Sequence, residues 1–424
     1  MLSIAGLYLF YRRRIILGLR PLNFKGPAII VVNHPSTLMD VLNPCIHIPR
    51  ESFFLANYSM FKNPVMNWLL TRLFCIPVKR REDVADGELR NNDTAFEKSI
   101  QHLEQGGMLF VAAEGVSWMD RTIRPFKSGA ARIAFGAEQR NLWELGVNIF
   151  PVGLSYNAPN LFRSEVIVHF GQPISATAWQ EAVKADSDQA IDLFTEQLRQ
   201  QIENLTLNTH SIEKQPFIER VELFFQHLFP HAGKALFDFR KSLIENNISN
   251  QNLEKEITSY FEQLEKEGLG HEAVREAFNN QHNQWRRFLI LIFGAPFALA
   301  GYLFWFLPCY LPWLLAKKLN LYIGYDSNVK FLTGLFTFPL ALWGAFKAVV
   351  WATGNSWWGW AALPGLFAVG YFSEFYGETW KAFRQTRHVS MVKRSQPEVL
   401  EAIKSAYLSI LSLCIYPLTE PHQT

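Results

Sequence analysis

The stretch Ala28-Ile29-Ile30-Val31-Val32-Asn33-His34-Pro35-Ser36-Thr37-Leu38-Met39-Asp40 decides how the first part of the chain folds. A β-branched apolar run bounded by Gly and Pro is typical of a buried strand. Pro35 cannot continue a strand ladder, but it fits the first turn of a helix. His34 should therefore lie at a strand-to-helix corner, where α/β folds commonly place functional groups. Asp40 is the one acidic residue among the first fifty positions, so it is the carboxylate that this segment offers to His34.

Composition divides the 424-residue chain into two parts. Residues 175–285 are rich in Glu, Gln, Asn and Lys, whereas residues 288–377 carry few charges and hold most of the tryptophans. The net charge of +3 does not indicate nucleic acid as a partner. The asymmetry predicts a soluble part followed by a membrane part.

The cysteines are spaced far apart and form no CxxC pair; they are Cys45, Cys75, Cys309 and Cys414. A disulfide framework and a structural zinc site are therefore not expected. We predict no metal ligands in this chain.

The N-terminal segment, residues 1–24, is apolar first and basic second, with Arg12, Arg13 and Arg14 after Phe10. A secretory signal has the opposite order. The pattern predicts an interfacial amphipathic helix, with apolar side chains at the headgroup boundary and arginines on anionic lipid. The alternative is a core helix of the first domain.

Strand and helix patterns alternate after this segment. They predict an α/β domain over residues 25–215, a mixed sheet with flanking helices. Residues 216–285 show only helical patterns with charges of alternating sign, which is typical of a solvated helical surface. We predict that this region is a helical linker, with a partner-binding surface as the alternative.

Three apolar stretches define a predicted membrane region at residues 286–378. Residues 288–316 contain Pro296, Pro308 and Pro312, which predicts a re-entrant or broken element. Residues 331–352 and 357–377 are predicted to span the bilayer, because about twenty apolar residues cross it. The alternative is a helical hairpin buried in a large soluble core.

Basic clusters predict the orientation of this membrane region. Arg286-Arg287 precede the first stretch, Lys317-Lys318 follow it, and several Lys and Arg residues follow the third stretch. Such clusters favour the cytoplasmic side. The sequence therefore predicts an integral membrane protein whose catalytic domain and C-terminal tail, residues 379–424, are both cytoplasmic.

Three further features follow predicted strands and accompany the His34 corner. The first is a basic run after Val78, the second is a carboxylate with a glycine, and the third is a basic cluster before an Ala-rich helix. Arginine binds phosphate bidentately and helix N-termini favour anions, so these clusters indicate a small phosphorylated substrate. The alternative for the first run is a solvated basic edge. The residues concerned are Lys79, Arg80, Arg81, Glu114, Gly115, Ser117, Arg121, Arg124 and Lys127.

The chain lacks the sequence signatures of several enzyme classes. It has no Walker loop, no GxGxxG after a first strand, no HExxH and no GxSxG. This disfavours kinases, dehydrogenases, zinc hydrolases and serine esterases. A histidine without a nucleophilic partner is suited to act as a general base on a substrate hydroxyl, with a carboxylate fixing its tautomer. His34 and Asp40 are thus the candidate catalytic residues.

Four ordered blocks over residues 25–175 resemble the glycerolipid acyltransferase (PlsC-like) superfamily. They are Asn33-His34-Pro35…Asp40, Ile76-Pro77-Val78-Lys79-Arg80, Glu114-Gly115 and Phe150-Pro151-Val152-Gly153. The resemblance implies that His34 is the catalytic base and Asp40 its partner. It also implies that Arg80 or Arg81, with Arg121 or Arg124, holds a glycerol phosphate, that Glu114 positions the acceptor, and that Asn33 belongs to the substrate site.

This sequence departs from the usual pattern of the superfamily at two places. Five residues rather than four separate His34 from Asp40, and the third block reads Ala113-Glu114-Gly115-Val116-Ser117 instead of Pro-Glu-Gly-Thr-Arg. A longer spacer is similar to that of a glycerol-3-phosphate and dihydroxyacetone-phosphate acyltransferase branch. The missing arginine implies that Arg121 or Arg124 replaces it.

The sequence thus predicts a membrane-bound O-acyltransferase of phospholipid biosynthesis. Its donor would be acyl-CoA or acyl-carrier protein, and its acceptor glycerol 3-phosphate or dihydroxyacetone phosphate. We expect no cofactor, and the predicted partners are these substrates and a phospholipid membrane. The alternatives are a 1-acyl-glycerol-3-phosphate acyltransferase and a catalytically inactive membrane scaffold.

Overall fold

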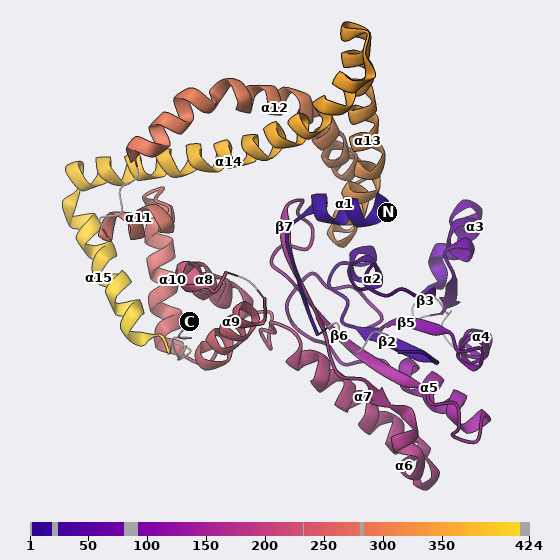
Figure 1. Ribbon diagram of the computed structural model, residues 1–424. Helices are drawn as coiled ribbons and strands as arrows, with labels where there is room; N and C mark the ends of the chain where they lie inside the picture. Colours follow the sequence, from indigo (N-terminus) through magenta and orange to yellow (C-terminus); the bar gives the residue numbers. More distant parts are fainter. Residues whose placement is uncertain (1, 19–23, 80–91, 232, 280–283, 416–424) are drawn as a thin grey trace, which may run out of the picture. The chain divides into compact units, whose positions relative to one another are not determined.

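The computed structural model describes residues 2–18, 24–79, 92–231, 233–279 and 284–415 (Figure 1). The chain forms two compact units. The first comprises Met1–Ile212, His231–Lys241 and Tyr322–Asn328, and the second comprises Glu213–Pro230, Ser242–Leu321 and Val329–Thr424. The predicted domain boundary at residue 215 is close to the first break, but two later segments of the chain also belong to the first unit.

The first unit is built on one mixed sheet, as the sequence predicts. Its strand order is β1-β7-β6-β2-β5-β3-β4, with β8 paired to β6. The pairs of β6 with β7 and with β8 are antiparallel, and the other pairs are parallel. The strands are β1 (Tyr11–Leu17), β2 (Ala28–Val32), β3 (Ser52–Asn57), β4 (Cys75–Val78), β5 (Met108–Ala112), β6 (Asn148–Tyr156), β7 (Ser164–Phe170) and β8 (Ile174–Ser175).

Strand β2 lies between β5 and β6, and all five of its residues are buried. This confirms the strand that the β-branched run predicts. In the parallel register, Val32 pairs with Ala112 on one side and with Val152 on the other. The carboxyl ends of β2 and β5 therefore meet at the same edge of the sheet, and the residues that follow them are neighbours.

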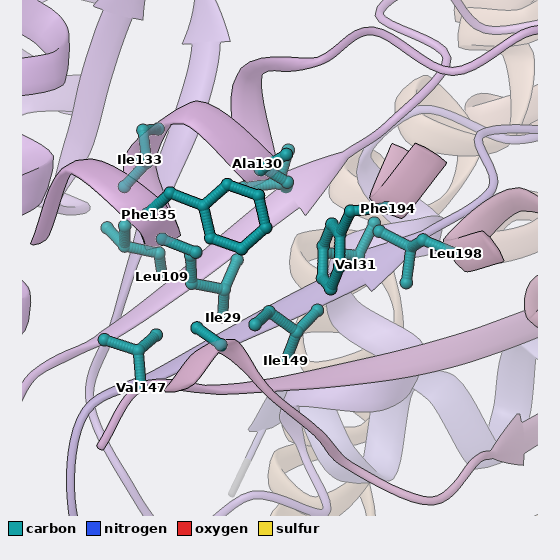
Figure 2. Packing of buried hydrophobic residues seen from close by; sticks show 14 of the residues in the cluster. Ile29, Val31, Leu109, Ala130, Ile133, Phe135, Val147, Ile149, Phe194 and Leu198 are labelled. Carbon is teal, nitrogen blue, oxygen red and sulfur yellow. The ribbon is translucent and has the colours of Figure 1, made fainter. Parts of the chain in front are cut away.

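The hydrophobic core of this unit lies between one face of the sheet and a layer of helices, of which three contribute most of the covering side chains. Figure 2 shows Ile29 and Val31 of β2 beneath Phe135 and Phe194. Alternate residues of a strand point to opposite faces, so these two β2 residues share a face that Ile30 does not. The covering helices are α4 (Asp93–Glu104), α5 (Gly129–Arg140) and α7 (Ser187–Asn204).

The N-terminal segment corrects the prediction of one interfacial helix over residues 1–24. Helix α1 (Leu2–Phe10) ends at Phe10, and the arginine run belongs to strand β1. Strand β1 pairs in parallel with β7, and Ile15 and Leu17 are buried. Burial of its apolar side chains and a sheet partner favour a strand over a continued helix here. Residues 19–23 lie outside the described residues.

The remaining short elements of the first unit surround the sheet. They are α2 (Leu38–Cys45), η2 (Tyr58–Lys62), α3 (Pro64–Arg72), η4 (Ala176–Trp179), α6 (Gln180–Ala185) and η6 (Ile323–Tyr325). Helix α2 follows β2 as the sequence predicts, although it begins at Leu38 rather than at Pro35.

The second unit contains a helical body with its own core, where the sequence predicts a linker at residues 216–285. Phe224, Tyr260, His271 and Tyr407 form a packed aromatic cluster. The last of these belongs to the C-terminal segment, which is why helical periodicity within residues 216–285 did not reveal this core. The helices are α8 (Gln215–Phe225), η5 (Gln226–Leu228), α9 (Gly233–Asn247), α10 (Gln251–Lys266), α11 (His271–Phe278) and α15 (Pro397–Leu413), of which α9 crosses the boundary between the units.

Three long helices occupy the predicted membrane region: α12 (Gln284–Leu319), α13 (Asp326–Thr353) and α14 (Ser356–Ser395). In the described part of the chain, Gln284–Leu319 and Ile323–Thr353 are long and apolar enough to cross a membrane. Little of either segment is buried, unlike the core hairpin that is the alternative. Helix α12 is continuous through its prolines, so the expectation of a broken or re-entrant element is wrong (Figure 1).

The predicted span at residues 357–377 is part of the much longer helix α14. Unlike the two segments above, it is not apolar enough to be counted as a candidate membrane span. Its Trp, Tyr and Gly residues lower its mean hydropathy. Helix α14 packs against α12: the Ser373 hydroxyl donates to Ala298 O at 3.0 Å, and Trp305 Nε1 donates to Leu366 O at 2.9 Å. These two hydrogen bonds join α12 and α14 directly.

The core makes a stability prediction at two adjacent residues of α7. Phe194 is fully buried against Phe135 and Trp179, whereas Leu193 is 55% exposed. Phe194→Ala should reduce the free energy of unfolding by about 3–5 kcal/mol, because it leaves a cavity. Leu193→Ala should change it by less than about 0.5 kcal/mol. Hydrogen exchange of the β2 and β5 amides in increasing urea measures the free energy of unfolding of both variants. Equal losses in the two variants would contradict this packing.

Candidate active site

The candidate active site is the corner after β2, where His34 and Asp40 form a pair. His34 Nδ1 lies 2.9 Å from Asp40 Oδ2. The Asp40 side chain is fully buried, and the His34 side chain is 14% exposed. Asp40 lies on the first turn of α2, which brings it back to His34 despite the five-residue spacer. With Nδ1–H donating to the carboxylate, Nε2 carries the free lone pair that a general base needs.

Asp40 is held by hydrogen bonds within an apolar setting. The Ser36 amide donates to Asp40 Oδ2 at 2.7 Å, next to the bond from His34. Burial raises the pKa of Asp40, whereas these hydrogen bonds and the charge of protonated His34 lower it. A carboxylate in this position fixes the imidazole tautomer and stabilises the imidazolium.

Glu114 holds the backbone of the His34 corner. Its Oε1 accepts from the His34 amide at 3.0 Å, and the Trp118 amide donates to His34 O at 3.1 Å. Burial raises the pKa of Glu114, and hydrogen bonds from the His34 and Arg124 amides oppose that shift. Two hydrogen bonds therefore join the loop after β5 to the loop after β2. Glu114 acts here on protein backbone, which differs from the predicted role of positioning the acceptor.

The Asn33 side chain joins the end of β2 to strand β6. Its Nδ2 donates to Leu154 O at 2.9 Å, and its Oδ1 accepts from the Leu154 amide at 2.8 Å. The side chain is 5% exposed. Both of its polar atoms are thus bonded to strand β6, and a substrate contact by Asn33 stays a prediction.

Gly115 and Ser117 shape the same loop. Gly115 has φ +74°, a backbone conformation that residues with a side chain rarely adopt, and a Cβ at this position would lie 3.4 Å from Lys127 Cγ. The Ser117 hydroxyl accepts from the Thr37 amide at 3.3 Å and is buried. Both residues lie at the corner as the sequence predicts, but Ser117 bonds to the spacer between His34 and Asp40.

The three predicted cations before α5 differ in their availability. Arg124 forms a two-pronged pair with Asp120, at 2.7 and 2.6 Å, and lies over the Trp118 ring. Arg121 Nε donates to Leu207 O at 3.0 Å. Lys127 is exposed, and no described residue forms a hydrogen bond or an ion pair with its ammonium group. Lys127 is therefore the cation of this cluster that is most available to a phosphate.

Lys79 follows β4 at the edge of the sheet, three strands away from β2. Three strand spacings correspond to about 14 Å. Its ammonium group lies 5.4 Å from the centre of the Tyr58 ring. Sheet order thus separates the second block from His34. Arg80 and Arg81, the other predicted cations of this block, lie outside the described residues.

A polar cluster behind Asp40 was not predicted. Asn43 Nδ2 donates to the hydroxyls of Tyr11 and Tyr156, each at 3.3 Å, and to Met39 O. The Tyr156 hydroxyl also faces Asp40, and its pKa is raised well above 10 by burial. Asn43 is three residues after Asp40, a helical spacing that could have revealed it. The tyrosines come from β1 and β6 and carry no such signal.

Comparison with known proteins agrees with this site. Residues 13–155 match the Acyltransferase family, described as "Acyltransferase". The chain therefore carries an acyltransferase-family domain of the PlsC-like type, and it contains both members of the His34–Asp40 pair.

Particular relatives have glycerolipid substrates in their names. Glycerol-3-phosphate O-acyltransferases 1 and 2 of Saccharomyces cerevisiae are 32% and 23% identical, over 19% and 48% of this chain and 10% and 28% of their own lengths. A chloroplast 1-acyl-sn-glycerol-3-phosphate acyltransferase of Brassica napus is 26% identical over 35% of this chain and 39% of its own. The chain therefore matches less than half the length of each relative.

One solved structure is similar to part of the chain. It is the 1-acyl-sn-glycerophosphate acyltransferase PlsC from Thermotoga maritima, with 20% sequence identity and a TM-score of 0.32. The match covers 47% of this chain and 76% of that chain.

The burial of Glu114 predicts a pH-dependent effect of Glu114→Gln. Because burial raises its pKa above the ordinary value of 4.5, the unfolded chain releases this proton at a lower pH than the folded one. Folding stability from Glu114 therefore falls from about pH 4.5 up to the raised folded pKa and is constant above it. Gln keeps an acceptor for the His34 amide without titrating. The stability of Glu114→Gln relative to the natural protein should rise across this window.

Unfolding midpoints of both proteins between pH 4.5 and 8 measure this difference. Glu181→Gln, at a side chain that is 85% exposed, is the control for the chemical change alone. A pH-independent difference for Glu114→Gln would show that Glu114 is not held in its buried position.

Proposed function

We propose that this protein transfers a fatty acyl group from acyl-CoA or acyl-carrier protein to a hydroxyl of glycerol 3-phosphate or dihydroxyacetone phosphate. The observation that carries the proposal is the 2.9 Å His34–Asp40 pair, on the buried corner of an acyltransferase-family domain. The pair leaves Nε2 of His34 free for proton transfer. No nucleophilic Ser or Cys is needed, because the acceptor hydroxyl itself is the nucleophile.

The proposed reaction transfers one acyl group to the acceptor and moves one proton from the acceptor hydroxyl to the leaving thiolate. His34 Nε2 takes the proton as the acceptor oxygen attacks the thioester carbonyl, which forms a C–O bond and a tetrahedral intermediate. The intermediate collapses, the C–S bond breaks, and the thiolate receives the proton from the imidazolium. Asp40 stabilises the imidazolium between these steps. The products are an acyl ester and a free thiol, and no redox cofactor is involved.

Lys127 is the proposed phosphate contact. Its side chain lies against Gly115, one residue after Glu114, which holds the His34 backbone. An ammonium without a protein partner forms charge-assisted hydrogen bonds to phosphate oxygens. Arg124 would have to release part of its pair with Asp120 to do the same. This places Lys127 ahead of Arg121 and Arg124 as the replacement for the arginine that the third block lacks.

The choice of acceptor is supported by the spacer and by the names of the yeast relatives. The five-residue spacer resembles that of the glycerol-3-phosphate and dihydroxyacetone-phosphate branch, and the yeast relatives are named glycerol-3-phosphate acyltransferases. A second candidate, the 1-acyl-glycerol-3-phosphate acyltransferase, is favoured by the name of the Brassica napus relative. The paired His34 and Asp40 disfavour an inactive scaffold.

We also propose that the protein works at a membrane, with the catalytic domain and the C-terminal tail on the cytoplasmic side. Besides the two apolar segments, helix α3 exposes its apolar side chains to solvent: Val65 is 72% and Trp68 is 59% exposed. Residues 52–79 contain lysine and arginine but no acidic residue. An apolar, basic surface is suited to an anionic bilayer.

The catalytic assignment predicts the effects of two substitutions. His34→Ala should abolish acyl transfer, and Asp40→Asn should lower kcat by about 10⁴, as expected when a carboxylate no longer fixes the imidazole tautomer. The measurement uses purified protein with labelled acyl-CoA or acyl-carrier protein and each of the three acceptors in turn. His210→Ala, at an exposed histidine, is the control. Activity that survives His34→Ala would exclude His34 as the base, and inactivity with every substrate pair would favour the scaffold.

The phosphate contact predicts a change in acceptor binding. Lys127→Ala should lower kcat/KM for the acceptor about 10- to 100-fold, mainly through KM, because a hydrogen bond to a charged group contributes about 1.5–3 kcal/mol. Lys127→Arg should retain most of the activity, and the exposed Lys98 provides the control Lys98→Ala. An unchanged acceptor KM in Lys127→Ala would assign the phosphate to another group.

A further inference from the structure

One segment of the first unit comes from a distant part of the sequence. Residues Tyr322–Asn328 lie at the junction of α12 and α13, yet they cluster with the acyltransferase unit. The segment comprises η6 (Ile323–Tyr325) and the first turn of α13. The family match covers residues 13–155, so this segment is outside it.

The segment is bonded to the spacer between His34 and Asp40. Thr37 Oγ1 donates to Gly324 O at 3.2 Å and accepts from Asn328 Nδ2 at 2.5 Å. Ser36 Oγ lies 3.2 Å from Ser327 Oγ, and both serines are buried. These contacts involve two of the five spacer residues, and the amide of one of them, Ser36, donates to Asp40 Oδ2.

The spacer needs such support because Thr37 is strained. It has φ +48° and ψ −113°, an uncommon conformation for a residue with a β-branched side chain. Strained backbone persists only where its surroundings over-determine it. The Ser117 hydroxyl holds the Thr37 amide from one side, and the Tyr322–Asn328 segment holds its hydroxyl from the other. The path of the five-residue spacer from His34 to Asp40 thus includes Thr37, whose conformation is held by hydrogen bonds to residues outside the spacer.

Asn328 gives a second reason to assign a role to this contact. Its Oδ1 is buried and has no hydrogen-bond partner among the described residues. A buried acceptor without a donor lowers stability, and an apolar residue of similar size would avoid the loss. Stability alone therefore does not explain Asn328, whereas its Nδ2 bond to Thr37 does.

We propose that Tyr322–Asn328 is a positioning element of the active site, in which Asn328 and Ser327 hold the spacer so that Asp40 orients His34. The proposal rests on the proposed acyl transfer. It makes catalysis depend on the junction of α12 and α13, a part of the chain remote from the family domain. Asn328 and Ser327 touch neither substrate nor the reacting atoms, so they act through Thr37 and Ser36.

The test is a double-mutant cycle on the full-length protein. Asn328→Ala and Thr37→Val should each lower kcat at least tenfold with little change in acceptor KM, and the double variant should lose no more than the larger single loss. Thr37→Ser keeps the hydroxyl and should stay within about threefold of the natural kcat. Asn252→Ala, at an exposed asparagine of α10 outside the segment, is the matched control and should leave kcat unchanged.

A second readout does not require activity. Hydrogen exchange of the amides of residues 36–40 should become at least tenfold faster in Asn328→Ala, while exchange within β6 stays unchanged and reports an intact fold. Unchanged exchange at the spacer, or losses of kcat that add independently in the cycle, would overturn the proposal. Faster exchange in a protein without acyl transfer would instead leave the positioning contact in place and refute the proposed function.

Discussion

The parallel pairing of β2 with both β5 and β6 is the constraint on which the site depends. It brings the ends of three strands to one edge of the sheet. Asn33 then continues the ladder from β2 to Leu154 with its side chain, and Glu114, just after β5, accepts the His34 amide. His34 is held through its own backbone on both sides before its side chain makes any contact. A strand shift by one residue would turn the buried β2 side chains to the other face and break all of these bonds at once.

The buried carboxylates at the corner, Asp40 and Glu114, lower the stability of the fold but fix the orientation of His34. Burial raises the pKa of Asp40 and of Glu114, which means that the fold disfavours their charged forms. Each is compensated by backbone amides rather than by a fixed cation: Ser36 for Asp40, and His34 for Glu114. This arrangement keeps the carboxylates in place while leaving the nearby Lys127 ammonium available. An ion pair with Lys127 would occupy the cation that we propose as the phosphate contact.

The rest of the chain shows how local patterns are overruled by long-range packing. Residues 11–17 are apolar and basic like an interfacial helix, but β7 supplies a strand partner. Residues 216–285 have the charge pattern of a solvated linker, but Tyr407, from far along the chain, closes an aromatic core over Phe224 and Tyr260. The prolines of α12 suggest a break, yet the helix continues, and its neighbour α14 bonds to it through Ser373 and Trp305. In each case the deciding contact joins residues that a local window does not contain together.

The sequence by itself determined the strand at residues 28–32, the corner at His34, the pairing candidate Asp40 and the family resemblance, because apolar periodicity, Pro35 and the ordered blocks are local properties. The contacts that the site residues make, by contrast, depend on the tertiary structure. Strand order placed Glu114 beside His34 and Lys79 about three strands away, and β6 took up both polar atoms of Asn33. Thr37, which no pattern singles out, became the point where a segment almost three hundred residues later meets the spacer. Hydrogen bonds between distant segments depend on the positions of whole strands and helices, and those positions are set by the packing of the entire core rather than by any stretch of the chain.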